Sequence, residues 1–256
     1  MNSDLREQQC RAVRWFYSEA GQTYLAVEQT AIDQQLKHIH GVHLAQLGIL
    51  DQAELYSASQ VAHCFSLATR ELVGADHACV TALHSLPLEQ NSVDCVLIHH
   101  ALEFAEDPHA ILREAARVVR PEGQIIVAMF NPWSLFAIQH KLAWRFRKAA
   151  WRSRSPGGHK LSDWLRLLDF SVQSVDHCWH LPVVRNASLA KRLLRYERPL
   201  HKLTSPFGAS VLIVAKKRNS TLIPIRRSWA ELSPGLTVPL MKPSTRAAME
   251  SKDNAQ

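Results

Sequence analysis

Two adjacent histidines and a glutamate follow the apolar run VDCVLI, and their types suit proton transfer. His99 and His100 come directly after this run, and Glu103 follows three residues later. A neutral imidazole has an ordinary pKa close to working pH, so it can take a proton from an incoming hydroxyl or amine. The alternative is that the two histidines finish a strand and hydrogen-bond its loop. On the first interpretation His99 and His100 are the predicted catalytic residues.

The histidines of this chain do not predict a metal site. Adjacent strand residues point to opposite faces of a sheet, so we expect His99 and His100 to be unable to share one ion. His38, His40 and His43 form a second histidine group, but no Cys or acidic residue accompanies them at a fixed spacing. The sequence therefore predicts no bound metal.

The stretch from residue 92 to 131 predicts the elements that place these side chains. After VDCVLI, Asp107 and Pro108 open a helix whose apolar residues recur at spacings of three and four. Pro121 and Gly123 stop that helix, and IIVAMF is then a fully buried strand. A strand, a helix and a strand in this length form a right-handed βαβ unit, which implies a parallel sheet covered by helices. Ligands of such sheets bind outside the carboxyl ends of the strands, where the histidines lie.

The motifs LPLEQNSVD and LREAARVVRPEG, with the strands beside them, resemble class I S-adenosylmethionine-dependent methyltransferases, particularly the type 11 group. The resemblance covers residues 41–216 and is strongest over residues 84–131. It implies a doubly wound α/β fold with a seven-stranded Rossmann-like sheet, in which the last strand, ASVLIVAKK, inserts antiparallel. It also implies S-adenosylmethionine as the cofactor and methyl transfer to an unidentified, small-molecule acceptor.

The segment HLAQLG at residues 43–48 falls where the family has its glycine-rich loop. The family places an acid and three glycines there, because the backbone must closely approach the methionine part of the cofactor. In this chain the acid is Gln46 and the first glycine is Gly48, while the other two glycine positions fall on Leu50 and Gln52. The chain thus resembles a divergent bacterial branch with a degenerate glycine-rich motif, and we expect weak cofactor binding.

Other cofactor contacts of the family are also altered. The acid that holds the ribose has no clear counterpart, with Glu71 and Asp76 as the alternatives. Ala82 stands where relatives carry an aspartate that contacts the adenine. The resemblance therefore implies a cofactor site made of the following residues: Gln46, Gly48, Leu83, His84, His99, His100 and Glu103.

Residues 1–40 predict an N-terminal helical cap. The segment has good helix formers, a break at Gly21, and the aromatic residues Trp15, Phe16 and Tyr17, which we expect to be buried anchors. In related methyltransferases such a segment covers the substrate side of the pocket. A packing helix pair without ligand contacts is the alternative.

The rest of the chain divides into a domain and a tail. Residues 41–217 form the methyltransferase-like domain. Residues 218–256 lose periodicity and are rich in Pro, Ser, Lys and Arg, which predicts a basic, mostly disordered tail.

The net charge of +7 is unevenly distributed along the chain. Residues 1–140 hold 8 Lys and Arg against 16 Asp and Glu, whereas residues 141–256 hold 22 against 7, so an anionic partner would meet the second half. A basic helical stripe follows spacings of four, three and four, at Lys141, Arg145, Lys148 and Arg152. Such a helix can bind RNA phosphates or lie on an anionic membrane surface. The alternative function is therefore a non-catalytic, methyltransferase-like protein that binds RNA or such a membrane.

Cysteine use and hydropathy predict a cytoplasmic protein. The five cysteines contain no CxxC pair, and an odd number suits a reducing compartment. The chain does not start with a basic region followed by an apolar one, and no apolar run approaches the roughly 18 residues that a transmembrane helix needs.

Overall fold

A computed structural model describes residues 3–50, 53–67, 82–145, 151, 154–180 and 207–218. Its strands are β1 (His43–Gly48), β2 (His63–Leu67), β3 (Val93–His99), β4 (Val119–Phe130), β5 (Phe170–Cys178) and β6 (Ser210–Lys217). Its helices are α1 (Ser3–Phe16), α2 (Glu19–Leu36), α3 (Pro108–Val118), α4 (Leu135–Arg145) and α5 (Gly158–Leu167), with a 3-10 turn η1 (Leu102–Phe104).

The six described strands form one mostly parallel sheet in the order β2-β1-β3-β4-β6-β5. Strand β1 pairs in parallel with β2 and β3, and β3 pairs in parallel with β4. Strand β6 is antiparallel to both of its neighbours, β4 and β5, which confirms the predicted insertion of ASVLIVAKK. The additional strand expected before Leu86 falls mainly on residues 68–81, which are outside the described residues, so a seventh strand stays a prediction.

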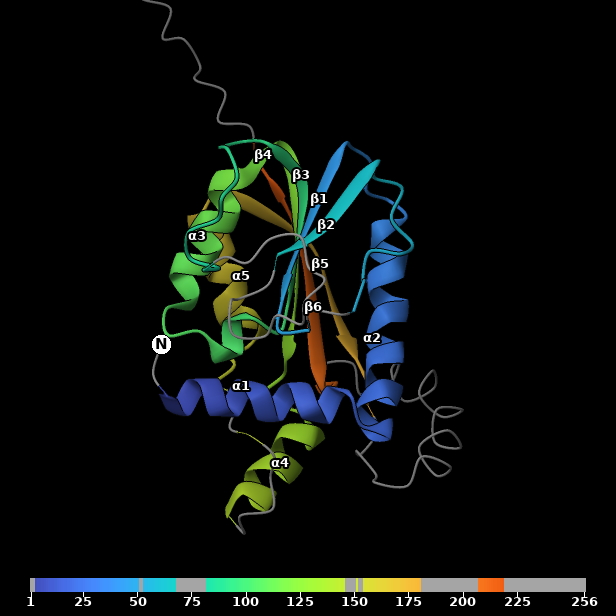
Figure 1. The fold of residues 1–256 in the computed structure, drawn as a ribbon, viewed down its shortest axis with the longest axis vertical. Helices are drawn as coiled ribbons and strands as arrows, with labels where there is room; N and C mark the ends of the chain where they lie inside the picture. The colour runs from blue at the N-terminus through green and yellow to red at the C-terminus, as the bar shows by residue number, and fades with distance from the viewer. Residues whose placement is uncertain are drawn as a thin grey trace, which may run out of the picture. The chain divides into compact units, whose positions relative to one another are not determined.

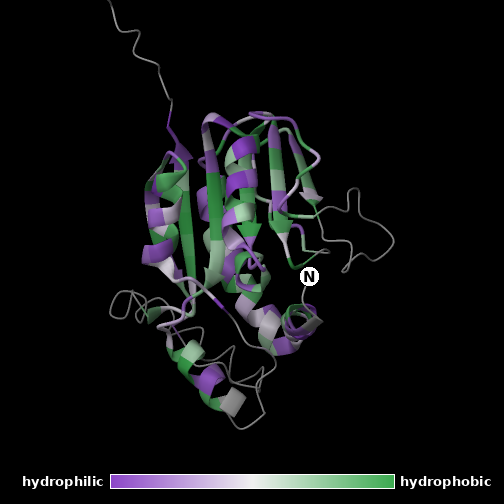
Figure 2. Cartoon of the chain, turned by 90° about the vertical axis from the view of Figure 1, so that its left-hand side faces the viewer, coloured by the Kyte–Doolittle hydropathy of each residue, from purple (hydrophilic) through white to green (hydrophobic). Residues whose placement is uncertain are grey.

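Helices cover both faces of the sheet, because successive strand residues point to opposite sides. In β3, Val96 and Ile98 pack with residues of α3 and α5, whereas Cys95 and Leu97 pack with residues of α2. Figure 1 shows α2 on one side of the sheet and α3 and α5 on the other. The strands are largely hydrophobic along their length, while the helices also carry hydrophilic residues (Figure 2). The core therefore consists of two apolar layers separated by the sheet.

The predicted βαβ unit is present as β3, α3 and β4. Strand β3 is buried at every position, as expected for a parallel strand covered on both faces. Asp107 caps α3 by accepting a hydrogen bond from the backbone N–H of Ala110, at 3.1 Å. The helix ends at Val118, before Pro121, because Val119 already has an extended backbone.

The N-terminal helices are separated at Ser18 and not at the predicted Gly21. Ser18 caps α2, and Gly21 lies in the first turn of that helix. A Cβ on Gly21 would lie 2.0 Å from the carbonyl oxygen of Trp15, so this glycine allows the two helices to approach closely. Phe16 is fully buried, but the expectation for Tyr17 was wrong, since its side chain is 47% exposed in the turn between the helices.

The basic half of the chain is described only in part. Lys141 is exposed on α4 and Arg145 is the last residue of that helix, whereas Lys148 and Arg152 lie outside the described residues. Residues 219–256 also lie outside them, so the predicted tail and domain boundaries stay predictions. None of the described helices is long and apolar enough to cross a membrane.

Candidate active site

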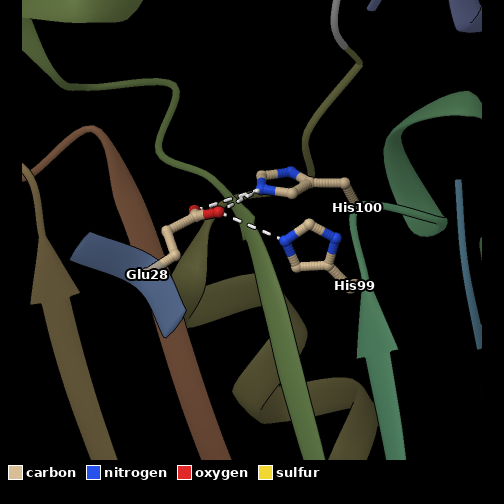
Figure 3. A group of neighbouring side chains, drawn as sticks. All are labelled: Glu28, His99 and His100. Atoms are coloured by element: carbon tan, nitrogen blue, oxygen red, sulfur yellow. Dashed lines mark hydrogen bonds and ion pairs between the residues drawn. The ribbon is translucent and has the colours of Figure 1, made fainter. Parts of the chain in front are cut away.

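A buried polar cluster lies at the carboxyl end of β3 and consists of Glu28, His99, His100 and Glu103, here called the Glu28 cluster. Figure 3 shows the first three of these residues. The Nε2 atom of His99 lies 3.2 Å from Glu28 Oε2, and the Nε2 atom of His100 lies 3.1 Å from Glu28 Oε1. On its other side, His100 Nδ1 lies 2.9 Å from Glu103 Oε1. The cluster thus joins α2 to the segment that follows β3.

The two adjacent histidines reach the same carboxylate because the backbone turns between them. His99 is the last residue of β3, and His100 has a φ of 50°, in the left-handed region that non-glycine residues seldom adopt. His100 therefore does not continue the alternation of the strand. The expectation that these side chains point to opposite faces and cannot share one ion is wrong for this reason.

Glu28 was not identified in the sequence, although a signal for it exists. The buried residues of α2 include Tyr24, Glu28, Ile32 and Leu36, which repeat every four residues on one face. A carboxylate on such an apolar stripe is costly unless it is paired. A glutamate between a tyrosine and an isoleucine at this spacing therefore indicates a buried partner.

Charges in the cluster shift the pKa values in opposite directions. Burial opposes the charged form of Glu28, but the positive charge of His100 and hydrogen bonds from both rings hold the pKa of this carboxyl well below its usual range. Burial also lowers the pKa of His100, yet the carboxylates of Glu28 and Glu103 outweigh it and raise this pKa to about 10. Burial and the neighbouring His100 lower the pKa of His99. At neutral pH His99 is thus the neutral imidazole of the pair and His100 the charged one, while a catalytic role for either stays a prediction.

The loop after β1 fits the methionine part of the cofactor at one position and not at the next. Gly48 lies beside His99 in the parallel ladder, and a Cβ on Gly48 would lie 3.1 Å from the carbonyl oxygen of His99. Leu50, at the second glycine position, is 2% exposed. It belongs to an apolar cluster rich in aromatic residues, which also contains Phe16, Tyr24, Ile49, Phe104, Phe130, Phe136, Trp151 and Trp179. The described loop therefore does not reproduce the glycine cradle.

Gln46 lies in β1 and holds the chain that follows this strand. Its Nε2 atom donates to the carbonyl oxygen of Ala53 at 2.6 Å, and its Oε1 atom accepts from the backbone N–H of Leu55 at 2.9 Å. Both ends of this buried amide are therefore used to hold the chain that follows β1. A neutral amide can do this at lower desolvation cost than the carboxylate of the family pattern.

Two further predicted cofactor residues, Leu83 and His84, have surroundings that differ from the Glu28 cluster. Leu83 is 8% exposed and packs in the apolar core with residues of α3 and α5. His84 is exposed and close enough to Glu114 of α3 for an electrostatic interaction. Glu71 and Asp76 lie outside the described residues. The assignments of Gln46, Gly48, Leu83 and His84 to the cofactor stay predictions.

Comparison with known proteins gives a consistent picture of the family. Residues 30–127 match the model of a methyltransferase domain. The uncharacterised protein YafS of Escherichia coli K12 is 29% identical over 213 residues, which are 81% of this chain and 82% of YafS. A malonyl-[acyl-carrier protein] O-methyltransferase of Halorhodospira halophila is 42% identical over 62 residues, which are 24% of this chain and 21% of that enzyme. The structure of an S-adenosylmethionine-dependent methyltransferase from Thermotoga maritima superposes with a TM-score of 0.58 at 18% identity, over 80% of this chain and 94% of that one.

The matched residues include the loop and most of the polar cluster described above. They run from the second half of α2 to β4, and so contain Gly48, His99, His100 and Glu103, while Glu28 lies just before them. The solved structure agrees in fold, and the family model agrees in sequence. Residues 30–127 are therefore similar in sequence to a methyltransferase domain, and the chain has the fold of S-adenosylmethionine-dependent methyltransferases.

Proposed function

We propose that this protein transfers a methyl group from S-adenosylmethionine to a small-molecule acceptor. The observation that carries the proposal is the family match over residues 30–127, in a sheet whose strand β6 is inserted antiparallel beside β4. When bound, the cofactor supplies an electrophilic methyl group, and the contribution of the protein is to hold that group in line with the acceptor. Positioning of this kind supplies about 7 to 11 kcal/mol in favourable cases.

The proposed cofactor site lies at the carboxyl ends of β1 and β3. Gly48 ends β1, and His99 ends β3 beside it. This edge is where open α/β sheets bind ligands. Because Leu50 is part of the apolar cluster, we expect the affinity for S-adenosylmethionine to be well below that of relatives with the complete glycine motif.

The same proposal gives His99 and His100 catalytic roles, which require that the acceptor can reach these two side chains. Neither side chain is exposed, and the Glu28 carboxylate that they contact is 2% exposed. An acceptor can therefore reach them only if the segments that cover them move aside.

Free thiols at Cys10, Cys64, Cys95 and Cys178 support the cytoplasmic location proposed from the sequence.

The proposal is tested by thermal unfolding of the full chain with S-adenosylmethionine and S-adenosylhomocysteine. A ligand at about five times its Kd stabilises the folded state by about 1 kcal/mol, so several millimolar ligand reveals even a millimolar site. We expect both ligands to raise Tm. No shift at several millimolar ligand overturns the proposal.

A matched pair of glycine variants locates the bound cofactor. Gly48→Ala adds a Cβ 3.1 Å from a backbone oxygen, at the predicted cofactor loop. Gly158→Ala adds a Cβ at the start of α5 at an ordinary contact distance, 3.4 Å from Val211 of β6. We expect Gly48→Ala to weaken cofactor binding and Gly158→Ala to leave it unchanged. Equal affinities in the two variants would place the cofactor elsewhere.

The first acceptor to test is a carboxylate on a malonyl thioester. The short match to a malonyl-[acyl-carrier protein] O-methyltransferase motivates this choice, although it spans 21% of that enzyme. Transfer of a labelled methyl group from the cofactor is the measurement. Failure with this acceptor rejects the malonyl proposal alone, since cofactor binding is tested separately.

A further inference from the structure

We propose that Glu28, His99 and His100 form a site for one divalent transition-metal ion, and that Zn²⁺ fits these ligands best. Each residue offers one ligand atom, and these atoms all lie within 4.8 Å of one another. Two imidazoles and a carboxylate are ligands that Zn²⁺ and related ions accept. This site does not depend on the proposed methyl transfer, and a bound ion would take the nitrogens that a general base at His99 or His100 would use.

The spacing of the ligand atoms suits a tetrahedral ion. The Nε2 atoms of His99 and His100 lie 3.2 Å and 3.3 Å from the same oxygen of Glu28, Oε2. Zinc bonds of about 2.0 to 2.1 Å in a tetrahedron place neighbouring ligand atoms about 3.3 Å apart. Figure 3 shows one nitrogen of each ring directed at the carboxylate. The two nitrogen–oxygen distances therefore match those of neighbouring ligands in a tetrahedral site.

The surroundings of His100 have the arrangement that orients a metal-binding histidine. Its Nδ1 atom lies 2.9 Å from Glu103 Oε1, the same oxygen that accepts the backbone N–H of Phe130 at 2.7 Å. A proton held on Nδ1 by this carboxylate leaves the lone pair of Nε2 for the ion. Metal-bound histidines almost always donate their other N–H in this way.

The charges of the cluster also favour a cation. Glu28 and Glu103 bring two buried carboxylates together, and among the described residues their ion pairs are with the two histidines. No Lys or Arg of the described part pairs with either of them. Buried charges are stable only when they are balanced. A divalent ion would displace the second proton of His100 and balance both carboxylates, with both imidazoles neutral.

A bound ion would tie distant parts of the chain together. Glu28 lies on α2, and the histidines lie at the end of β3, 71 residues further along the chain for His99. Binding to the folded state alone stabilises that state. Three protein ligands leave one tetrahedral position for a water molecule or a substrate oxygen, as in catalytic zinc sites.

The test uses the full chain after removal of metals with a chelator. We expect calorimetry to show one Zn²⁺ per chain, with a higher Tm, and Co²⁺ to give the visible absorption of a tetrahedral complex. Mg²⁺ prefers octahedral oxygen ligands, so it should bind far more weakly. Absence of stoichiometric binding at micromolar Zn²⁺ overturns the proposal.

Variants assign the ion to this cluster. Glu28→Gln and His99→Gln each remove one ligand and should abolish stoichiometric binding. If Glu28→Gln fails to fold, His99→Gln still tests the site, because it keeps the contacts of His100 with both carboxylates. Glu103→Gln removes the orienting carboxylate and should weaken binding about 10- to 100-fold. Binding that is unchanged in a folded Glu28→Gln or His99→Gln variant overturns the proposal.

The matched control is a second histidine pair on the surface. His43 and His63 are exposed, with their Nδ1 atoms 3.2 Å apart, and such a pair can hold Zn²⁺ by itself. The double variant His43→Gln/His63→Gln should keep the stoichiometry, the Tm shift and the Co²⁺ spectrum. If this double variant loses the ion, the surface pair is the site and the proposal is wrong.

Discussion

The βαβ unit of β3, α3 and β4 and the loop after β1 are neighbours in the sheet, but they follow the family pattern to different degrees. In the unit, a strand buried at every position, a capped helix and a second buried strand appear where the motifs predict them. At the end of β1 and in the loop after it, Gln46 and Leu50 replace the acid and a glycine, and both are buried. One holds the loop backbone and the other packs among aromatic residues.

This difference shows that the fold and the cofactor contacts of the family are separable. The unit supports the sheet, so its apolar residues are required whether or not a ligand binds. The loop is required in its glycine-rich form only for close approach of the cofactor. In this chain the apolar packing of Leu50 takes the place of one glycine of the loop. Similarity in fold therefore indicates the architecture of the chain better than its affinity for the cofactor.

Truncation of Leu50 tests this comparison with the largest expected effect. Leu50→Ala leaves a cavity in the apolar cluster and should lower the free energy of unfolding by about 3 kcal/mol. If the leucine obstructs the cofactor, the same change should tighten S-adenosylmethionine binding about tenfold, which corresponds to about 1.4 kcal/mol. Urea unfolding and calorimetry measure the two effects.

A control separates obstruction from general loosening. Leu161→Ala removes an equally buried side chain from α5, on the face that carries α3. It should cost a similar free energy of unfolding and leave cofactor affinity unchanged. Cofactor binding that weakens in Leu50→Ala would mean that the leucine supports the site.

Removal of the Asp94 carboxylate tests how two regions, the βαβ unit and the start of β1, the strand that leads into the loop, are joined. Asp94 of β3 accepts the backbone N–H groups of Val42 and His43, at 2.7 and 2.8 Å, and pairs with Arg120 at 2.6 Å. Asp94→Ala leaves two donors at the start of β1 without this partner and should cost about 2 kcal/mol in urea unfolding. Asp163→Ala breaks an exposed pair with Arg166 and should stay within about 0.5 kcal/mol. Similar costs for both variants would show that the two regions are not joined through Asp94.

Acidification tests the aromatic cluster beside the loop through His140 of α4. Burial lowers the pKa of His140 to about 4, and its ring lies 4.5 Å from the ring of Trp151. The unfolded chain, with a pKa near 6.5, binds the proton more readily, so stability contributed at this site is present above pH 6.5 and is lost towards pH 4.

The expected loss is the smallest of the three effects. Between pH 7 and pH 5 it should be about 1 kcal/mol, after allowance for the partial exposure of the ring. His140→Leu should remove this part of the pH dependence, as measured by urea unfolding at both pH values. A variant with the pH profile of the parent would show that His140 does not carry it.

The parts of the fold that follow from local pattern could be predicted. The apolar spacing of α3 and the uninterrupted apolar run of β3 are properties of short segments, and the turn residues between them are visible in the sequence. Prediction of the antiparallel direction of β6 also required the family resemblance, because the sequence of a single strand does not indicate how it pairs with its neighbours. The departure at Leu50 was visible, but the aromatic cluster that surrounds it was not.

The polar cluster depends on tertiary contacts and was therefore only partly predictable. His99, His100 and Glu103 were visible as a group after a strand. The left-handed backbone of His100 has no clear sequence signal, and it decides that both rings face Glu28. Glu28 needs a partner only because α2 packs on the sheet and buries its carboxylate. The same residue on an exposed helix face needs none.

The position of β6 has a consequence for synthesis of the chain. Strand β5 pairs with β6, and β6 separates it from β4, although β6 comes after both in the sequence. Until Ser210–Lys217 has left the ribosome, β4 and β5 cannot make their ladders with β6, and nascent chains carry unpaired strand edges. Such edges favour aggregation, and pairings across long stretches of chain form slowly. Completion of the sheet is therefore a late event, and ribosome stalling before Ser210 should yield species that need chaperone protection.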